Sequence, residues 1–170
     1  LEMMSPKISE TALQRRSDAL NALVDSIPYI QYLGVRFNPQ DDRLTAFLPF
    51  NKKLIGNPIK PALHGGVTVA FLEVTAMITL NWFNLNDETA YENLDFEKIR
   101  AGWFLKLPET IDFSVDYLRA GLPEDAYARA HIIRSGRRYA SVHVEGWQNS
   151  KEKLFAYATG HFVLPQRPLE

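Results

Sequence analysis

The feature that most constrains this chain is a long apolar segment that opens with two glycines and holds a single acidic residue. After His64-Gly65-Gly66, residues 67–83 are almost all apolar, and Glu73 is the one ionisable side chain among them. A helix that is apolar on all sides is buried by the rest of its fold, so we expect a central helix over about 66–82. A buried carboxylate without a partner is costly. Glu73 is therefore expected to be protonated, hydrogen-bonded or engaged in chemistry.

The segments around this stretch alternate apolar and polar residues, which is typical of half-buried strands. Residues 34–37 and 43–49 flank a turn-like sequence at 38–42, which predicts an antiparallel hairpin. Residues 51–63, rich in Pro and Gly, are expected to form a loop. Four more strands are predicted in the C-terminal half, at 110–118, 126–133, 139–147 and 154–164. Together these elements indicate an α+β fold in which one antiparallel sheet curls round the central helix.

Two further segments lie outside this core. Residues 9–27 repeat leucines at helical spacing and place Arg16 on the opposite, polar side, so they predict an extra N-terminal helix that Pro28 ends. The charged and aromatic stretch 84–108 is interpreted as an insertion that covers the end of the central helix, with a short helix near 95–102. Insertions of this length often act as lids.

Composition sets the remaining bounds. With 170 residues, 46% of them hydrophobic, the chain is expected to form one domain over 1–170. A formal net charge of -1 gives no electrostatic footprint for nucleic acid or an anionic membrane. The absence of cysteine excludes disulfides and thiolate metal sites and suits a cytoplasmic location. No signal peptide is expected, and the apolar run, broken by Glu73, is predicted to fall short of the ~20 residues that span a bilayer.

Three sequence motifs carry a resemblance to a known family. The run Pro61-Ala62-Leu63-His64-Gly65-Gly66, an acidic residue nine positions after the histidine, and the segment Ile111-Asp112-Phe113-Ser114-Val115-Asp116-Tyr117-Leu118-Arg119 resemble the hot-dog fold acyl-CoA thioesterases. This group includes the phenylacetate-pathway and 4-hydroxybenzoyl-CoA thioesterases, and the similarity extends over roughly 34–164. The resemblance implies a hot-dog fold and hydrolysis of an acyl-CoA thioester to a free acid and CoA. It also implies a homodimer or a dimer of dimers, with sites at the subunit interface and no cofactor or metal beyond the CoA of the substrate.

The same residues fit thioester chemistry on physical grounds. A thioester carbonyl needs a hydrogen-bond donor where negative charge develops, and a carboxylate that attacks it or activates water. The free N–H groups at a helix start supply such a donor, and Gly65 and Gly66 allow a ligand to approach the backbone closely. Glu73 lies eight residues beyond Gly65, or about 12 Å along the axis at ~1.5 Å per residue. The more economical arrangement pairs Gly65 of one subunit with Glu73 of another, in an isologous dimer.

The resemblance assigns further roles near this motif. Thr110 matches a hydroxyl that positions the attacking water in some relatives, although threonine is also ordinary in a strand. Many relatives have an amide six residues before the histidine, where this chain has Pro58, so Asn57, one residue earlier, is the weaker match. His64 either takes part in catalysis or only caps the helix. Met77 stands where one branch has a threonine, and it makes the pocket there more apolar.

Coenzyme A carries phosphates, so a chain with little net charge needs local cations to hold it. Arg119, Arg137 and Arg138 match places where relatives contact the nucleotide, and arginine suits phosphate through its forked donors. The alternative for Arg137 and Arg138 is a solvated turn. Gly66 is assigned with them to substrate binding.

Several residues keep structural alternatives. Glu73 could form a salt bridge with an arginine across a dimer contact, and the glycine pair could serve close packing alone. Three histidines stand singly in strands and are predicted to be structural, with no metal: His131, His143 and His161. Three aromatics either line an acyl pocket or pack in the core or lid: Trp82, Trp103 and Phe104.

Two other functions compete with hydrolysis. A non-catalytic acyl-CoA sensor is compatible with the same fold, but the retained acid argues for chemistry. The hot-dog hydratases and dehydratases also pair a histidine with an acid, yet their histidine precedes a Phe-Pro-Gly turn, which this chain lacks.

Overall fold

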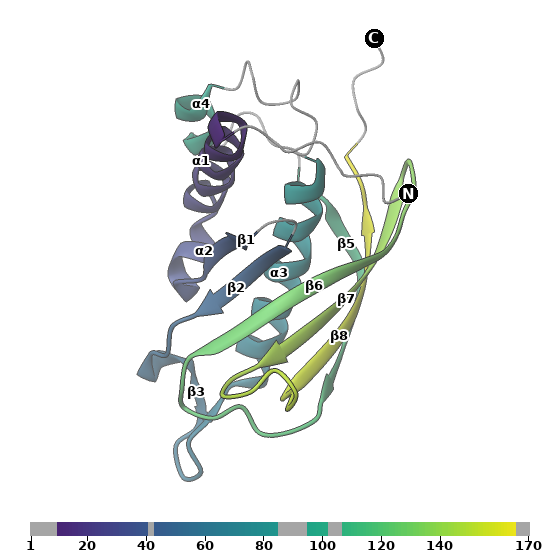
Figure 1. Ribbon diagram of the computed structural model, residues 1–170. Helices are drawn as coiled ribbons and strands as arrows, with labels where there is room; N and C mark the ends of the chain where they lie inside the picture. Colours follow the sequence, from purple (N-terminus) through teal and green to yellow (C-terminus); the bar gives the residue numbers. More distant parts are fainter. Residues whose placement is uncertain (1–9, 41–42, 85–94, 102–106, 166–170) are drawn as a thin grey trace, which may run out of the picture.

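A long helix and a curved antiparallel sheet form the body of the fold (Figure 1). The computed structural model describes residues 10–40, 43–84, 95–101 and 107–165. The helices are α1 Glu10–Ser26, α2 Pro28–Leu33, α3 Gly65–Asn84 and α4 Phe96–Arg100, with a 3-10 turn at Lys52–Leu54. The strands are β1 Arg36–Gln40, β2 Arg43–Leu48, β3 Ile55–Asn57, β4 Ala62–Leu63, β5 Glu109–Tyr117, β6 Ala126–Ser135, β7 Tyr139–Trp147 and β8 Ala156–Val163.

Six of the strands form one sheet in the order β1-β2-β6-β7-β8-β5, and every neighbouring pair is antiparallel. The sheet lies against one side of α3, as Figure 1 shows. The predicted α+β hot-dog architecture, with its extra N-terminal helix, is confirmed. Because β5 is an edge strand, one row of its backbone groups faces away from the sheet.

The expected hairpin is present, but its predicted turn at 38–42 is wrong. Asn38 and Pro39 belong to β1, and Pro39 pairs with Leu44 of β2. Proline has no N–H to donate, so a sheet tolerates it at an edge, and β1 is the edge strand opposite β5. The expected loop at 51–63 likewise contains the 3-10 turn and the small hairpin β3–β4.

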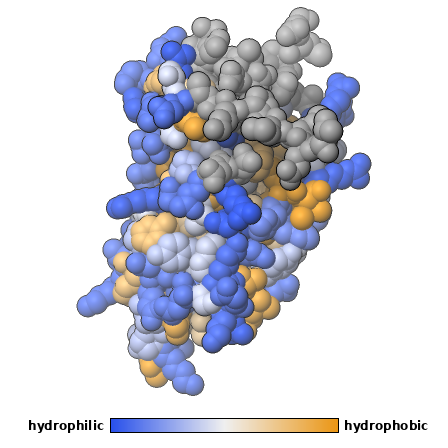
Figure 2. Space-filling view, viewed as in Figure 1, coloured by the Kyte–Doolittle hydropathy of each residue, from blue (hydrophilic) through white to orange (hydrophobic). Residues whose placement is uncertain are grey.

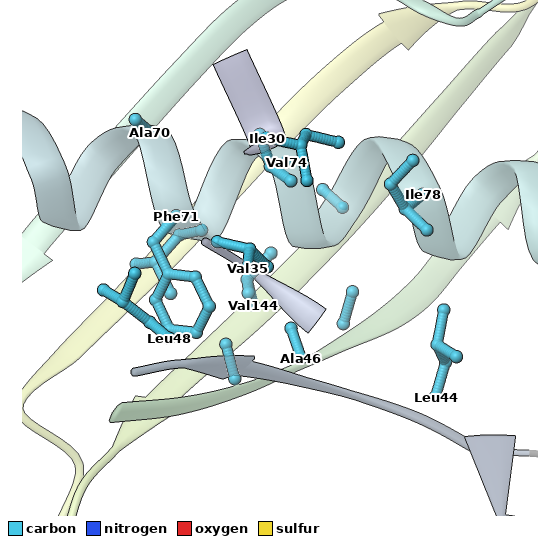
Figure 3. Close-up of a cluster of buried hydrophobic side chains, with 14 of the residues drawn as sticks. Ile30, Val35, Leu44, Ala46, Leu48, Ala70, Phe71, Val74, Ile78 and Val144 are labelled. Atoms are coloured by element: carbon cyan, nitrogen blue, oxygen red, sulfur yellow. The ribbon is translucent and has the colours of Figure 1, made fainter. Parts of the chain in front are cut away.

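Helix α3 packs against β2, β6, β7 and β8 and is covered on most of its surface. Figure 3 shows Phe71 and Ile78 extending from α3 toward Leu48 and Leu44 of β2. The prediction that the apolar run falls short of a membrane span is wrong by length and composition. Residues 65–83 are long and apolar enough to cross a membrane, with a mean hydropathy of 1.4, but 67% of that window is buried inside the fold. The apolar composition of α3 is therefore accounted for by its place in the core.

Small residues on the inner face of the sheet let α3 lie close to it. The buried alanines are Ala46, Ala126, Ala128, Ala130, Ala140, Ala156 and Ala158. At Gly146 a Cβ atom would come within 3.1 Å of the Leu72 side chain. These positions fix the depth of the helix, and with it the height of Glu73 above the strands.

The N-terminal segment differs from the prediction in two ways. Pro28 does not simply end the helix, because α1 stops at Ser26 and Pro28 starts the short helix α2, where a missing N–H costs nothing. Arg16 does not lie on a polar face: it is buried, its Nη2 donates to the Trp82 carbonyl at 2.7 Å, and its guanidinium lies 3.6 Å from the Trp82 ring centre. Trp82 is thus a buried residue that joins α1 to the end of α3.

The segment 84–108 is described only in part. A helix was expected near 95–102, and α4 confirms it: the Asp95 side chain caps its start, Ile99 is buried, and the helix packs against α1. Trp103, Phe104 and the lid role of the insertion lie outside the described residues. Figure 2 shows that the viewed face of the molecule is mainly hydrophilic, with hydrophobic residues scattered among polar ones.

Candidate active site

The start of α3 is capped by a histidine. The His64 carbonyl accepts the first helical hydrogen bond, from Thr68 N–H at 3.1 Å, so His64 is the N-cap residue. Its side-chain Nδ1 accepts from Gly66 N–H at 2.9 Å. The capping role weighed for His64 is therefore present, and the Gly66 N–H is already engaged. Among the described residues nothing accepts a hydrogen bond from Gly65 N–H, which leaves that donor available to a ligand.

Close packing round His64 explains the glycines. A Cβ atom on Gly66 would lie 3.0 Å from His64 Nδ1, and one on Gly56 would lie 2.7 Å from the His64 Cα atom. A Cβ atom on Gly65 would lie 3.2 Å from the Tyr117 hydroxyl oxygen. The glycines thus serve tight packing as well as an open backbone, so the two explanations given for them from the sequence do not exclude each other.

Tyr117, at the end of β5, holds the first turn of α3 from the side. Its hydroxyl donates to the Gly65 carbonyl at 2.9 Å. The sequence singled this tyrosine out only as part of a family-like strand and gave it no role. The signal was available: alternation along β5 places Phe113, Val115 and Tyr117 on the face that looks toward α3.

Glu73 is half-buried on α3, and its carboxylate has a partner in the same chain. The Thr110 hydroxyl donates to Glu73 Oε1 at 2.6 Å. Of the three states expected for Glu73, the structure shows the hydrogen-bonded one, and it brings together the two residues assigned to the nucleophilic side of the reaction. A carboxylate that accepts one such bond keeps other lone pairs, with which it can bind water.

A β-bulge turns Thr110 toward Glu73. Thr110 pairs with Phe162 and Asp112 pairs with His161, so Ile111 is an extra residue in β5. In a regular strand Thr110 would share a face with Asp112. The extra residue instead puts Thr110 on the inner face with the buried Phe162. Nothing in the sequence analysis predicted this bulge.

Two hydrogen bonds join α3 to β5, from Tyr117 to Gly65 and from Thr110 to Glu73, and they are well separated along both elements. Gly65, Val69, Glu73 and Met77 follow one another at four-residue spacing, and none of them is fully buried. Thr110 and Tyr117 are seven residues apart in β5, or ~23 Å at about 3.3 Å per residue. The candidate site residues of one chain therefore form two groups, which we call half-sites: the Gly65–Tyr117 end and the Glu73–Thr110 end.

Asn57 does not join either half-site. Its side-chain oxygen accepts hydrogen bonds from the N–H groups of Ile59 and Lys60, at 3.0 and 3.2 Å, inside the β3–β4 turn. This is an Asx turn, for which asparagine is well suited. The structure thus gives Asn57 a local structural role.

The three arginines lie at opposite ends of β8. The Arg119 backbone N–H donates to the Phe155 carbonyl beside the start of β8, and its side chain donates to the Leu154 carbonyl at 3.1 Å. Arg137 and Arg138 lie exposed in the β6–β7 turn, where the Arg138 carbonyl accepts from Leu164 N–H at the other end. Within one chain Arg119 therefore accompanies the Gly65–Tyr117 end, and the paired arginines accompany the Glu73–Thr110 end.

Arg119 also borders a hollow of about 390 Å³ with Lys153 and Phe155. The remaining lining residues are Ala120, Leu122, Gln148, Asn149 and Ser150. The two cations at the wall of this hollow can attract an anionic group.

The strand histidines have separate partners on the outer face of the sheet. His131 lies 3.3 Å from Glu145, His161 lies 3.4 Å from Asp112, and His143 packs edge-on against Tyr157. Across the described ranges, no three histidine or acidic side chains come together as a metal-binding group.

Comparison with known proteins agrees with the family resemblance found in the sequence. A family model described as Thioesterase superfamily matches residues 61–154. The chain is 29% identical over 140 residues to the medium/long-chain acyl-CoA thioesterase YigI of Escherichia coli K12, covering 81% of this chain and 86% of YigI. A crystal structure of a Chromobacterium violaceum protein is 31% identical, with a TM-score of 0.62 over 95% of this chain and 100% of that one. A Shewanella oneidensis protein related to the thioesterase superfamily gives a TM-score of 0.69 at 23% identity, over 93% of this chain and 100% of its own.

Proposed function

Because this chain belongs to the thioesterase superfamily, we propose that it hydrolyses an acyl-CoA thioester to a free acid and CoA, at a site shared between two subunits. The observation that carries the proposal is the hydrogen bond between Thr110 and Glu73, at the opposite end of β5 from the Gly65 N–H, which no described residue engages. The Glu73 carboxylate and the Gly65 N–H are the two groups that thioester hydrolysis needs. The carboxylate activates water or attacks, and the N–H stabilises the charge on the carbonyl oxygen.

The sharing of the site rests on the edge strand β5. Its side chains are mostly exposed, including the apolar Ile111 and Tyr117 at 55% and 54%. An exposed edge is a template for pairing with another strand. If β5 pairs antiparallel with β5 of a second copy about a two-fold axis, the Gly65–Tyr117 end of each chain meets the Glu73–Thr110 end of the other. Each dimer then has two equivalent sites.

The same dimer would bring the three candidate phosphate-binding arginines to one site. Arg119 of one subunit and the Arg137–Arg138 pair of the other then flank one site, although they lie at opposite ends of a single chain. We assign these cations to the phosphates of CoA, whose charge the near-neutral chain must balance locally. We expect the assembly to be a homodimer or a dimer of dimers, and we place it in the cytoplasm.

The acyl group is proposed to be an apolar chain of medium or long length. YigI, 29% identical over most of this chain, is named for such substrates. Beyond Glu73 the same side of α3 presents Met77, which is half-buried and apolar. No metal or further cofactor is invoked, because the carboxylate supplies the base or nucleophile and the N–H stabilises the oxyanion.

The first test is Glu73→Gln, assayed by release of free thiol from a panel of acyl-CoAs. The substitution keeps the shape of the side chain but removes the base, so turnover is expected to fall by at least 10²-fold, with binding of CoA retained. Glu97→Gln is the matched control, since Glu97 is 86% exposed and forms a surface salt bridge with Arg100, outside both half-sites. Equal turnover in both variants would refute the role of Glu73. Binding of acyl-CoA by the wild type without hydrolysis would identify a sensor.

The second test asks whether two subunits share the site. Gly65→Pro removes the N–H at the first helical position, where proline is well tolerated. Gly65→Ala keeps the N–H and measures how much of the effect comes from the added Cβ atom, which would lie 3.2 Å from the Tyr117 hydroxyl oxygen. Each of Gly65→Pro and Glu73→Gln alone is expected to be inactive. After subunit exchange, half the dimers are mixed and each has one intact site, so about a quarter of wild-type activity should return. A mixture that stays inactive would show that the site is built within one chain.

A further inference from the structure

Tyr117 and His64 are joined through a single peptide group. The Tyr117 hydroxyl donates to the Gly65 carbonyl, and the N–H of the next residue, Gly66, donates to His64 Nδ1; both distances are 2.9 Å. The Gly65 carbonyl and the Gly66 N–H belong to the same planar, conjugated unit. A bond donated to the carbonyl polarises the N–H and strengthens the bond it donates in turn.

This pair of hydrogen bonds, which we call the relay, determines which ring nitrogen of His64 carries the proton. A ring nitrogen that accepts a hydrogen bond carries no proton, so the neutral imidazole must hold its proton on Nε2. His64 is exposed and directly precedes Gly65 in the chain. Its Nε2–H is then a second donor, in addition to the Gly65 N–H, directed by the ring plane that Gly56 and Gly66 hold from two sides.

We propose that Tyr117 is a positioning residue, which locks the peptide group between Gly65 and Gly66 and thereby keeps His64 in the Nε2–H tautomer that donates to the thioester group. The inference rests on the proposed hydrolysis for its effect on rate. Its structural part, the tautomer, stands without it. It also explains why residue 65 is glycine, because a Cβ atom there would lie 3.2 Å from the tyrosine hydroxyl and disturb the bond.

The alternative is that Tyr117 only stabilises the helix start. Such a role would change the stability of the protein but would leave the ring proton of His64 where it is. The two roles therefore differ in a spectroscopic signature and can be separated by a variant that removes only the hydroxyl.

The variant is Tyr117→Phe, with Tyr139→Phe as the matched control. The two tyrosines are similarly exposed, at 54% and 59%. Ala140 and Val142 are buried on the inner face of β7, so Tyr139 lies on the outer face, away from α3. Long-range ¹H–¹⁵N spectra of the imidazole rings report the tautomer of His64, whose signals are identified by their loss in His64→Gln. Thiol release from acyl-CoA gives kcat and KM for each variant.

In the wild type and in Tyr139→Phe, His64 is expected to be in the Nε2–H form. In Tyr117→Phe the Nδ1–H form should become populated, and kcat should fall about tenfold, equivalent to about 1.4 kcal/mol, while KM changes less than about twofold. An Nδ1–H tautomer in the wild type overturns the proposal whatever the variants do. An unchanged tautomer in Tyr117→Phe also overturns it, even if kcat falls.

The outcomes separate this proposal from the proposed function. If Glu73→Gln hydrolyses as fast as the wild type, the function fails, yet the tautomer measurement on Tyr117→Phe remains decisive for the relay. If Glu73→Gln is inactive and the tautomer of His64 does not respond to Tyr117→Phe, the function stands and the relay fails.

Discussion

Replacing Arg16 by alanine should lower the melting temperature of this protein markedly. Arg16 is 2% exposed, donates to the Trp82 carbonyl at 2.7 Å, and stacks its guanidinium 3.6 Å from the centre of the Trp82 ring. The carbonyl lies in the last turn of α3, where the helix dipole favours a cation. One side chain therefore joins the N-terminal helix to the end of the central one.

The size of the effect follows from these contacts. A hydrogen bond from a charged donor contributes about 1.5–3 kcal/mol, and a desolvated cation–π contact contributes about 2 kcal/mol. The two share one guanidinium and are not additive, so we expect a loss of about 3–4 kcal/mol, within the range for breaking a buried charged contact. For a chain of this length each kcal/mol lowers Tm by about 2–4 °C, which gives a fall of about 6–16 °C.

The measurement is thermal unfolding followed by circular dichroism, with Arg15→Ala as control. Arg15 is exposed on the same helix, so its loss removes the same charge and should change stability by less than about 0.5 kcal/mol. Arg16→Lys keeps the charge but loses the planar stack, and its Tm should lie between those of the wild type and Arg16→Ala. If Arg15→Ala and Arg16→Ala lower Tm equally, the contact with Trp82 does not stabilise the fold and the reasoning is wrong.

Two further substitutions test the site and the sheet beneath it. Thr110→Val keeps the shape of the side chain but removes the hydroxyl that bonds Glu73, so kcat should fall about 10–100-fold in the thiol-release assay. Gly160→Ala would place a Cβ atom 2.7 Å from both Phe113 and Phe162, so the free energy of unfolding in urea should fall by about 1–3 kcal/mol.

Each has a control in the same chain. Thr110→Ser restores the hydroxyl and should recover most of kcat, and failure of that rescue would mean that the methyl group, not the hydrogen bond, matters. For the sheet, Gly136→Ala places a Cβ atom 3.5 Å from the Tyr139 carbonyl, an ordinary contact. Equal destabilisation at Gly136 and Gly160 would contradict the packing argument.

The fold was predictable where hydrophobic period alone decides it. The all-round apolar pattern of α3 and the alternation in β6 to β8 left little choice of architecture. The errors came where tertiary contacts override a local signal. Arg16 looked like a solvent-facing residue on an amphipathic helix. It is buried instead, because its guanidinium donates a hydrogen bond to the carbonyl of Trp82, more than sixty positions away. Pro39 looked like a turn residue, but the edge position of β1 removes the cost of a missing N–H.

The site was predictable in its residue types and not in its connections. Glu73 and Thr110 were both assigned from the sequence, yet strict alternation would turn Thr110 away from α3, and only the extra residue at Ile111 brings it back. A bulge leaves no reliable trace in a single sequence, because any residue can occupy it. Tyr117 was missed for a related reason: its partner is a backbone carbonyl, which every residue has.

The bulge and the tyrosine together bear on why one chain would need another. Side chains on a helix lean toward its N-terminus, so an unrestrained Glu73 would tilt along its own helix toward Gly65. The bond to Thr110 holds the carboxylate over the start of β5 instead, while Tyr117 holds Gly65 at the end of the same strand. Reacting groups must come within about 3–3.5 Å of the carbonyl, so we propose that one thioester is met by the Gly65 N–H of one subunit and the Glu73 carboxylate of another, with both bonds kept. The subunit-exchange experiment tests this arrangement.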